Sequence, residues 1–162
     1  MLHQDDWFAY DESLQEYVAL IERDPSTKFA FSAAVARDIS GRLLFQHSPT
    51  DRQIQELRRD PRCLLQANFV GPPSATIYRR SGKFQFDTNL KWLVDVDAYV
   101  RILSEGGRFQ YSSRPLINVT AGAAHQVTRE VQGNPILQYV ENAYVYRAFC
   151  FTGLERDRMS VV

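Results

Sequence analysis

The sequence is poor in cysteine and carries no excess charge of either sign. Its 162 residues include two cysteines, Cys63 and Cys150, which are too few for an oxidised scaffold and lack metal-ligand spacing, so we expect both to be reduced core residues. The 19 basic residues are balanced by 19 acidic ones. Proteins that bind nucleic acid through its phosphates need a surplus of Lys and Arg, so nucleic acid is not expected as a partner.

Long apolar stretches are also absent. No run of about 18 apolar residues occurs, so the sequence predicts no membrane span. The acidic start at residues 1–6 contains no hydrophobic signal region, and we therefore expect a cytoplasmic protein. The remaining composition is that of an ordinary globular protein, with 44% hydrophobic and 23% charged residues. Because no linker rich in proline, glycine or serine divides the chain, we expect a single domain over residues 1–162.

Helical and strand patterns alternate along the chain. Apolar residues at helical spacing predict helices at 12–23, 51–59, 62–68, 95–104 and from Pro135 onward. Extended patterns predict strands at 28–36, 42–47, 74–80, 108–112 and 115–119. The first two strands flank a turn and are expected to form a hairpin. This alternation predicts an α/β fold with a mixed sheet.

The first and last helices each have an apolar stripe that we expect to be buried. In the first helix the stripe consists of Leu14, Tyr17, Val18 and Ile21, with Asp11 and Ser13 as capping groups. The last helix is expected to begin with Asn134 as N-cap and to bury Ile136, Leu137, Val140, Tyr144 and Ala148.

An acidic pair, Asp5 and Asp6, stands near the N-terminus just before Trp7. Two carboxylates at the end of a strand can bind a hard divalent cation together with phosphate oxygens and water. The alternative is that they are solvated charges, or caps for the helix that follows.

A second acidic pair, Asp95 and Asp97, lies in an otherwise apolar run after Trp92. Charges among apolar neighbours are costly unless they are paired or functional, and a carboxylate in such surroundings can reach the basicity of a general base. Capping of the helix N-terminus is the alternative for both residues.

A histidine, His125, is the one large polar residue in a stretch of small residues at 121–124. Small residues allow the backbone to approach a ligand closely. A surface histidine, or one held by hydrogen bonds, is the alternative.

Taken in order, these blocks resemble the C-terminal half of the family 2 glycosyltransferases, which have the GT-A fold and are typical of bacterial surface-polysaccharide synthesis. Residues 2–8 look like the family's Asp-x-Asp region, and residues 68–74 are similar to the loop and strand midway through these enzymes. Residues 92–101 look like the segment with the catalytic acid, and 125–128 with 134–135 resemble the last recognisable block. The resemblance covers about residues 2–146.

The resemblance implies an inverting transferase that moves a sugar from a nucleotide-diphosphate sugar to the hydroxyl of a sugar or glycolipid acceptor. Asp95 would be the base, with Asp97 as the close alternative. A divalent metal, Mn or Mg, would be held by Asp5 with Asp6 beside it, and by His125. The implied substrate contacts are Trp92 and Arg101. Trp92 would stack on an acceptor ring, and its alternative is core packing. The alternative for Arg101 is a solvated position on the helix.

The sequence departs from the family pattern in three ways. His3 stands where the family has its first Asp, and Val94 where many relatives carry Glu. The family's N-terminal nucleotide-binding strands are missing, so we expect a mixed-sheet fragment of the GT-A fold, the acceptor-side part of the enzyme. Such a chain should turn over nucleotide sugars poorly by itself. We also expect Asp5 and His125 to converge on one site.

Two other functions remain open. A non-catalytic fragment or pseudoenzyme would act as an interaction domain, and in either case unpaired sheet edges favour homo-oligomers. A glycoside hydrolase would need two acids across a cleft, with Asp5 as the partner of Asp95 or Asp97.

Overall fold

The computed structural model describes residues 2–79, 84–122, 131 and 133–150. In this part of the chain, five strands form one mixed sheet in the order β1-β5-β2-β3, with β4 also paired to β2. Strands β2 and β5 run parallel, whereas the β1–β5, β2–β3 and β2–β4 pairs are antiparallel. The expectation of an α/β fold with a mixed sheet is therefore confirmed. The strands are β1 (Trp7–Phe8), β2 (Thr27–Arg37), β3 (Leu43–His47), β4 (Thr76–Tyr78) and β5 (Arg108–Thr120).

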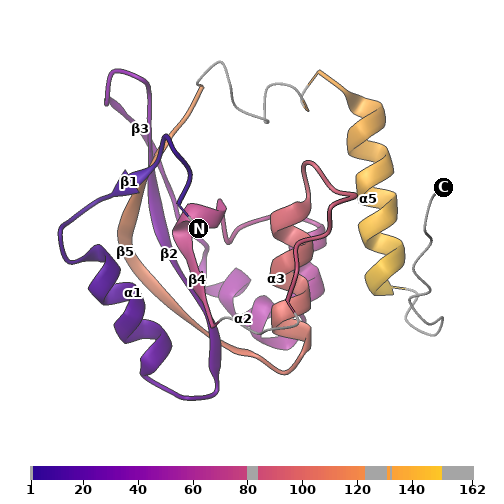
Figure 1. Ribbon diagram of the computed structural model, residues 1–162, viewed down its shortest axis with the longest axis horizontal. Helices are drawn as coiled ribbons and strands as arrows, with labels where there is room; N and C mark the ends of the chain where they lie inside the picture. The colour runs from indigo at the N-terminus through magenta and orange to yellow at the C-terminus, as the bar shows by residue number, and fades with distance from the viewer. Residues whose placement is uncertain (1, 80–83, 123–130, 132, 151–162) are drawn as a thin grey trace.

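Helices cover both faces of this sheet (Figure 1). One face packs against α1, and the other packs against α2, α3 and the 3₁₀ helix η1, with α5 beyond them. A second 3₁₀ helix, η2, leads directly into β4. The helices are α1 (Ser13–Glu22), α2 (Asp51–Arg59), η1 (Pro61–Leu65), η2 (Pro73–Ala75), α3 (Val94–Ser104) and α5 (Pro135–Cys150).

The alternation along β2 divides the core in two. Phe29 and Phe31 point into the larger cluster, which contains α3, whereas Ala30 points into the smaller cluster under α1. Both phenylalanines are fully buried, and such burial is worth about 2 kcal/mol per side chain. The sheet is therefore anchored on the side of α3, the helix that carries Asp95.

The segments predicted at 108–112 and 115–119 join into the single strand β5. Ser32 of β2 pairs with Ser112, but the next residue, Ala33, pairs with Pro115. The residues between Ser112 and Pro115 have no partner in β2 and form an irregularity in the β2–β5 pairing. Pro115 has no backbone N–H to donate, so it suits this position. The interruption in the sequence pattern therefore marks a bulge and not a strand end.

Several short elements differ from expectation in length. The segment predicted as a helix at 62–68 is the 3₁₀ helix η1, whose first turn is capped by Asp60 accepting the N–H of Arg62 at 2.9 Å. The strand predicted at 74–80 forms only over β4, because η2 occupies the residues before it. Helix α2 has the predicted bounds, and Thr50 with Gln53 forms a capping box at its start.

The buried faces of α1 and α5 are turned relative to expectation. In α1, Tyr17 and Ile21 are buried as predicted, but Leu14 is 52% exposed and the N-cap residue Glu12 makes no side-chain cap. In α5, Asn134 caps the helix by accepting the N–H of Leu137 at 3.0 Å. The α5 residues that are buried are Glu141, Val145 and Phe149, whereas Ile136, Val140 and Tyr144 are exposed.

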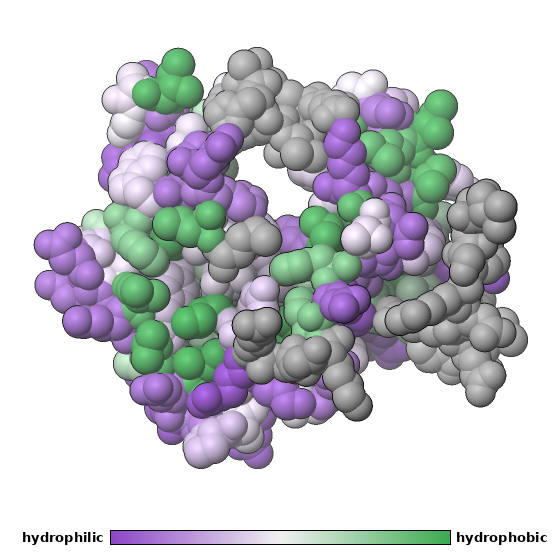
Figure 2. Space-filling model, in the orientation of Figure 1, coloured by the Kyte–Doolittle hydropathy of each residue, from purple (hydrophilic) through white to green (hydrophobic). Residues whose placement is uncertain are grey.

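Apolar side chains consequently lie on the outer surface of the N-terminal end of α5 (Figure 2). Cys150, at the end of α5, is exposed, so the expectation that it is a core residue is wrong; Cys63 is half-buried, and both thiols are free. Within the described residues, the search for a helix with the length and hydropathy of a membrane span finds none.

Candidate functional site

Three segments that lie far apart in the sequence meet at one place: the N-terminal acidic segment, the loop between η1 and η2 together with η2 itself, and the start of α3. The backbone N–H of His3 donates to Ser74 Oγ at 2.9 Å, and Asn68 Nδ2 donates to Asp95 Oδ2 at 3.1 Å. The imidazole of His3 is close enough to Asp95 to lower its pKa. We call His3, Asp6, Asn68, Ser74 and Asp95 the carboxylate site.

Asp95 lies in the first turn of α3, which begins one residue earlier than predicted. Its Oδ1 accepts the N–H of Val96 at 2.8 Å, and its Oδ2 accepts from Asn68. Burial raises the pKa of Asp95 to about 6, while these hydrogen bonds and the charge of His3 oppose the increase. A carboxyl group that titrates near neutral pH is suited to act as a general base.

The loop that carries Asn68 is held rigidly. Asn68 Oδ1 accepts the N–H of Gly71 at 3.0 Å, which directs its Nδ2 toward Asp95 as a donor. Tyr99 of α3 donates to the Gly71 carbonyl at 3.2 Å. Gly71 has φ +96°, and a Cβ there would lie 3.0 Å from Cδ2 of His47. Both the conformation and the space at this position require glycine.

Asp6 contributes a second buried carboxylate. It is 7% exposed, its Oδ1 accepts the N–H of Thr120 at 3.2 Å, and burial raises its pKa. Its Oδ2 is buried and has no hydrogen-bond partner among the described residues; the nearby hydroxyl of Ser74 lowers the pKa of Asp6 without completing a bond to this oxygen. The nearest cationic candidate is His3 Nδ1, at 3.9 Å from Oδ2.

Asp6 Oδ2 and the His3 ring fit a divalent cation that takes its other ligands elsewhere. Mg²⁺ and similar ions are often bound by one or two carboxylates plus phosphate oxygens and water. Within the described part of the chain, no group of three or more His, Cys, Asp or Glu side chains could form a complete cation site.

The other expected metal ligands are placed differently. Asp5 is half-buried beside the site, and its carbonyl accepts a hydrogen bond from the hydroxyl of Thr120. His125 lies outside the described residues, so its convergence with Asp5 stays a prediction. Of the expected metal ligands, Asp6 is therefore the one with a buried oxygen in the carboxylate site that has no hydrogen-bond partner among the described residues.

Asp97 and Arg101 pair with each other on α3. Asp97 is 1% exposed, and its Oδ2 accepts from Arg101 Nε at 2.7 Å. Arg101 also donates to the carbonyl of Gln85 at 2.8 Å and lies 5.0 Å from the ring centre of Phe84. Because residues two apart are about 200° apart around a helix, this pair lies on a different side of α3 from Asp95. Its contacts attach α3 to the loop that precedes it.

Sequence reasoning missed Asn68, Ser74 and, above all, Glu141. Glu141 is 2% exposed on α5, and its carboxylate accepts the N–H groups of Lys91, Trp92 and Leu93 at 2.8, 2.9 and 2.9 Å. The available signal was an acidic residue in an otherwise apolar and aromatic helix. The backbone of Trp92 is thus fixed by α5, while its side chain is half-buried.

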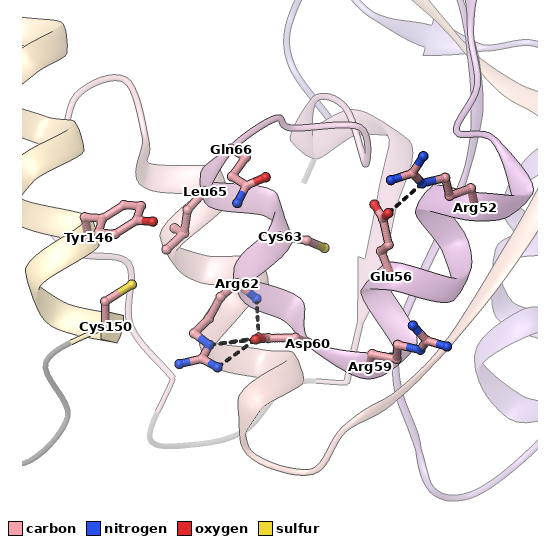
Figure 3. A pocket seen from close by; sticks show the side chains of 10 residues that line it. All are labelled: Arg52, Glu56, Arg59, Asp60, Arg62, Cys63, Leu65, Gln66, Tyr146 and Cys150. Carbon is pink, nitrogen blue, oxygen red and sulfur yellow. Dashed lines mark hydrogen bonds and ion pairs between the residues drawn. The ribbon is translucent and has the colours of Figure 1, made fainter.

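A separate open pocket of about 510 Å³ lies among α2, η1 and α5 (Figure 3). Two of its arginines are already paired, Arg52 with Glu56 at 2.8 Å and Arg62 with Asp60 at 2.7 Å. The sulfur of Cys63 points away from Cys150 (Figure 3), and burial raises the pKa of the Cys63 thiol to about 11. None of the residues lining this pocket belongs to the carboxylate site, so we assign no chemistry to it.

Comparison with known proteins adds no relative: no family model matches the chain, and no curated protein matches it.

Proposed function

We propose that this chain is the acceptor-side part of an inverting, family 2-like GT-A glycosyltransferase. It would transfer a sugar from a nucleotide-diphosphate sugar to a hydroxyl of a sugar or glycolipid acceptor, in the cytoplasmic synthesis of bacterial cell-surface polysaccharide. The observation that carries the proposal is the meeting of Asp95 and Asp6 through His3 and Ser74. One carboxylate has the basicity of a proton acceptor, and the other keeps a buried oxygen that has no hydrogen-bond partner in the described part of the chain.

In this proposal Asp95 takes the proton of the acceptor hydroxyl as that oxygen attacks the anomeric carbon. A base with a pKa of about 6 is ionised at neutral pH and still basic enough to accept a proton in the transition state. Asn68 and the N–H of Val96 hold the carboxylate in one orientation, and each oxygen keeps a lone pair beyond these hydrogen bonds. Trp92, next to the start of α3, would stack on the acceptor ring.

Asp6 and His3 would hold the divalent cation, Mn or Mg. When bound, this ion would neutralise the charge on the departing nucleoside diphosphate. The role of Asp6 follows from its unpaired oxygen, and that of His3 from the 3.9 Å between its Nδ1 and that oxygen.

Mn²⁺ binding tests the metal part of the proposal on the chain itself. Electron paramagnetic resonance of Mn²⁺ is measured with and without a nucleoside diphosphate. We expect binding that the nucleotide strengthens and that Asp6→Asn removes. Asp60→Asn is the matched control, because Asp60 is an acidic residue paired with Arg62 outside the site. Equal Mn²⁺ binding by the wild type and Asp6→Asn would refute the assignment.

Transfer tests the reaction. Nucleotide-diphosphate sugars are supplied with glycan acceptors to the chain and to any longer form that its reading frame encodes, and the anomeric configuration of the product is read by NMR. We expect inversion, an acid limb near pH 6 from Asp95, and loss of transfer in Asp95→Asn. We expect slow turnover by the 162-residue chain alone. A product of retained configuration, or an undiminished rate in Asp95→Asn, contradicts the proposal.

Exposed apolar side chains favour one alternative, a non-catalytic interaction domain. Ile39 is 83% exposed, Tyr139 76% and Ile136 74%. Self-association that rises with concentration in size-exclusion chromatography, with no binding of Mn²⁺ or nucleotide, would favour this alternative.

A further inference from the structure

The segment that leads into α3 is held by a residue of another helix. The N-cap residue, Leu93, makes no side-chain cap, and residues 91–93 lie just ahead of the first helical residue, Val94. Glu141 of α5 accepts the N–H groups of all three. Its Oε1 accepts from Lys91, and its Oε2 accepts from Trp92 and Leu93, all within 2.9 Å.

The contact between Glu141 and residues 91–93 is strong for two reasons, the charge of the carboxylate and the geometry of its hydrogen bonds. A carboxylate at a helix N-terminus interacts favourably with the helix dipole, and hydrogen bonds to an ionised acceptor are about twice as strong as neutral ones. Glu141 is 2% exposed, so water cannot easily replace it. Three successive N–H groups that converge on one carboxylate fix the backbone immediately before the turn that carries Asp95.

The position of that turn determines the surroundings of Asp95. The carboxylate reaches Asn68 at 3.1 Å only while the first turn of α3 stays against the loop at 68–71. On the other side, Val145 and Phe149 attach α5 to the main core independently of Glu141. Losing the Glu141 carboxylate would therefore release the turn while α5 remains docked.

We propose that Glu141 is the positioning residue for Asp95: its carboxylate on α5 holds the start of α3 so that the half-buried Asp95 carboxylate stays hydrogen-bonded to Asn68. The role in catalysis rests on the proposed function, but the structural coupling does not. Glu141 itself touches only the backbone ahead of Asp95, so it acts through that residue.

The test measures Asp95 directly, by NMR titration of its side-chain carboxyl carbon in Glu141→Gln. The groups that face Asp95 are His3 from the N-terminal segment, Asn68 from the loop and Tyr99 from α3 itself. None of them is changed by the substitution. We expect the pKa of Asp95 to fall from about 6 by at least about one pH unit, because the released turn admits water and so reduces the burial that raises this pKa.

Val145→Ala is the matched control. It removes methyl groups from the same face of α5, one turn after Glu141, and leaves the hydrogen bonds of Glu141 to residues 91–93 in place. We expect it to lower stability and leave the pKa of Asp95 unchanged. If Glu141→Gln does not fold, Glu141→Asp keeps the charge but shortens the reach, and it should shift this pKa in the same direction.

An unchanged pKa of Asp95 in the folded Glu141 variant, or an equal shift in Val145→Ala, overturns the proposal. In an enzyme with transfer activity, Glu141→Gln should lower kcat about tenfold or more at neutral pH and leave the KM of the acceptor nearly unchanged. A shifted pKa together with an undiminished rate of transfer in Asp95→Asn would refute the proposed function while the positioning role stands.

Discussion

Replacing Asp95 by Asn is expected to make the protein more stable above pH 6, at the site where we place the base. Folding removes the Asp95 carboxyl from water, which disfavours its charged form. The folded state therefore keeps the proton up to a pKa of about 6, whereas the unfolded chain releases it near the ordinary value of 3.8. Because the folded state binds the proton more tightly, the free energy of unfolding falls as the pH rises between these two values.

The gap between 3.8 and about 6 corresponds to a loss of about 3 kcal/mol in the free energy of unfolding once the pH is well above both values. An asparagine avoids this loss because it carries no charge. Because asparagine has one acceptor oxygen in place of two, one of the hydrogen bonds from Asn68 and from Val96 is lost, which costs about 1 kcal/mol at any pH. The net gain for Asp95→Asn is about 2 kcal/mol at pH 8, and it is about 1.4 kcal/mol smaller at pH 5.

Urea unfolding followed by tryptophan fluorescence at these two pH values measures the difference. Comparing the variant with the wild type removes the titration of all other groups. Asp60→Asn is the control: hydrogen bonding to Arg62 lowers the pKa of Asp60 below its ordinary value of 3.8, so its contribution is already complete at pH 5 and this variant should lose the same stability at both pH values. If the stability difference between Asp95→Asn and the wild type is the same at both pH values, the reasoning about burial is wrong.

Three further outcomes are expected from single substitutions. Arg101→Met removes the guanidinium that pairs with the buried carboxylate of Asp97 and should lower the free energy of unfolding in urea by about 3 kcal/mol; a loss typical of a surface pair would contradict this. Gly71→Ala should lower it by about 2 kcal/mol, since φ is +96° and the new Cβ meets His47 at 3.0 Å; an unchanged thermal midpoint would show that the loop adapts. Asp6→Asn should stabilise the protein more at alkaline than at acid pH, because burial raises the pKa of Asp6; a urea titration with no pH dependence would disprove it.

The site could be predicted from the sequence only where its chemistry is local. Asp95 was recognisable because a charge in an apolar run is costly without a reason, and the structure places that carboxyl in a half-buried position where its pKa is raised. Its partner Asn68 could not be assigned this way, since the hydrogen bond joins residues 27 positions apart. Ser74 and His3 are 71 positions apart. Periodicity reports which side of an element is buried, but not which elements meet.

Helix α5 shows where periodicity itself fails. Its sequence has apolar or aromatic residues on more than one side, so no single stripe is marked as the buried one. The side that faces the core contains Glu141, an acidic residue that a hydropathy pattern assigns to solvent. Three backbone N–H groups from another part of the chain make its burial favourable, and those groups are invisible in the pattern of α5.

The central position of β2 has a consequence for how the chain folds. β2 and β3 form a local hairpin, which closes within microseconds, whereas the parallel partner β5 joins residues about 81 positions apart, as Arg37 and Asn118 do. At a synthesis rate of roughly 5–20 residues per second, β5 emerges from the ribosome several seconds after the hairpin, and during this time β2 lacks its parallel partner. Until then the phenylalanines of β2 have no sheet to bury them. Nascent chains of this protein should therefore need protection by a chaperone until β5 is complete.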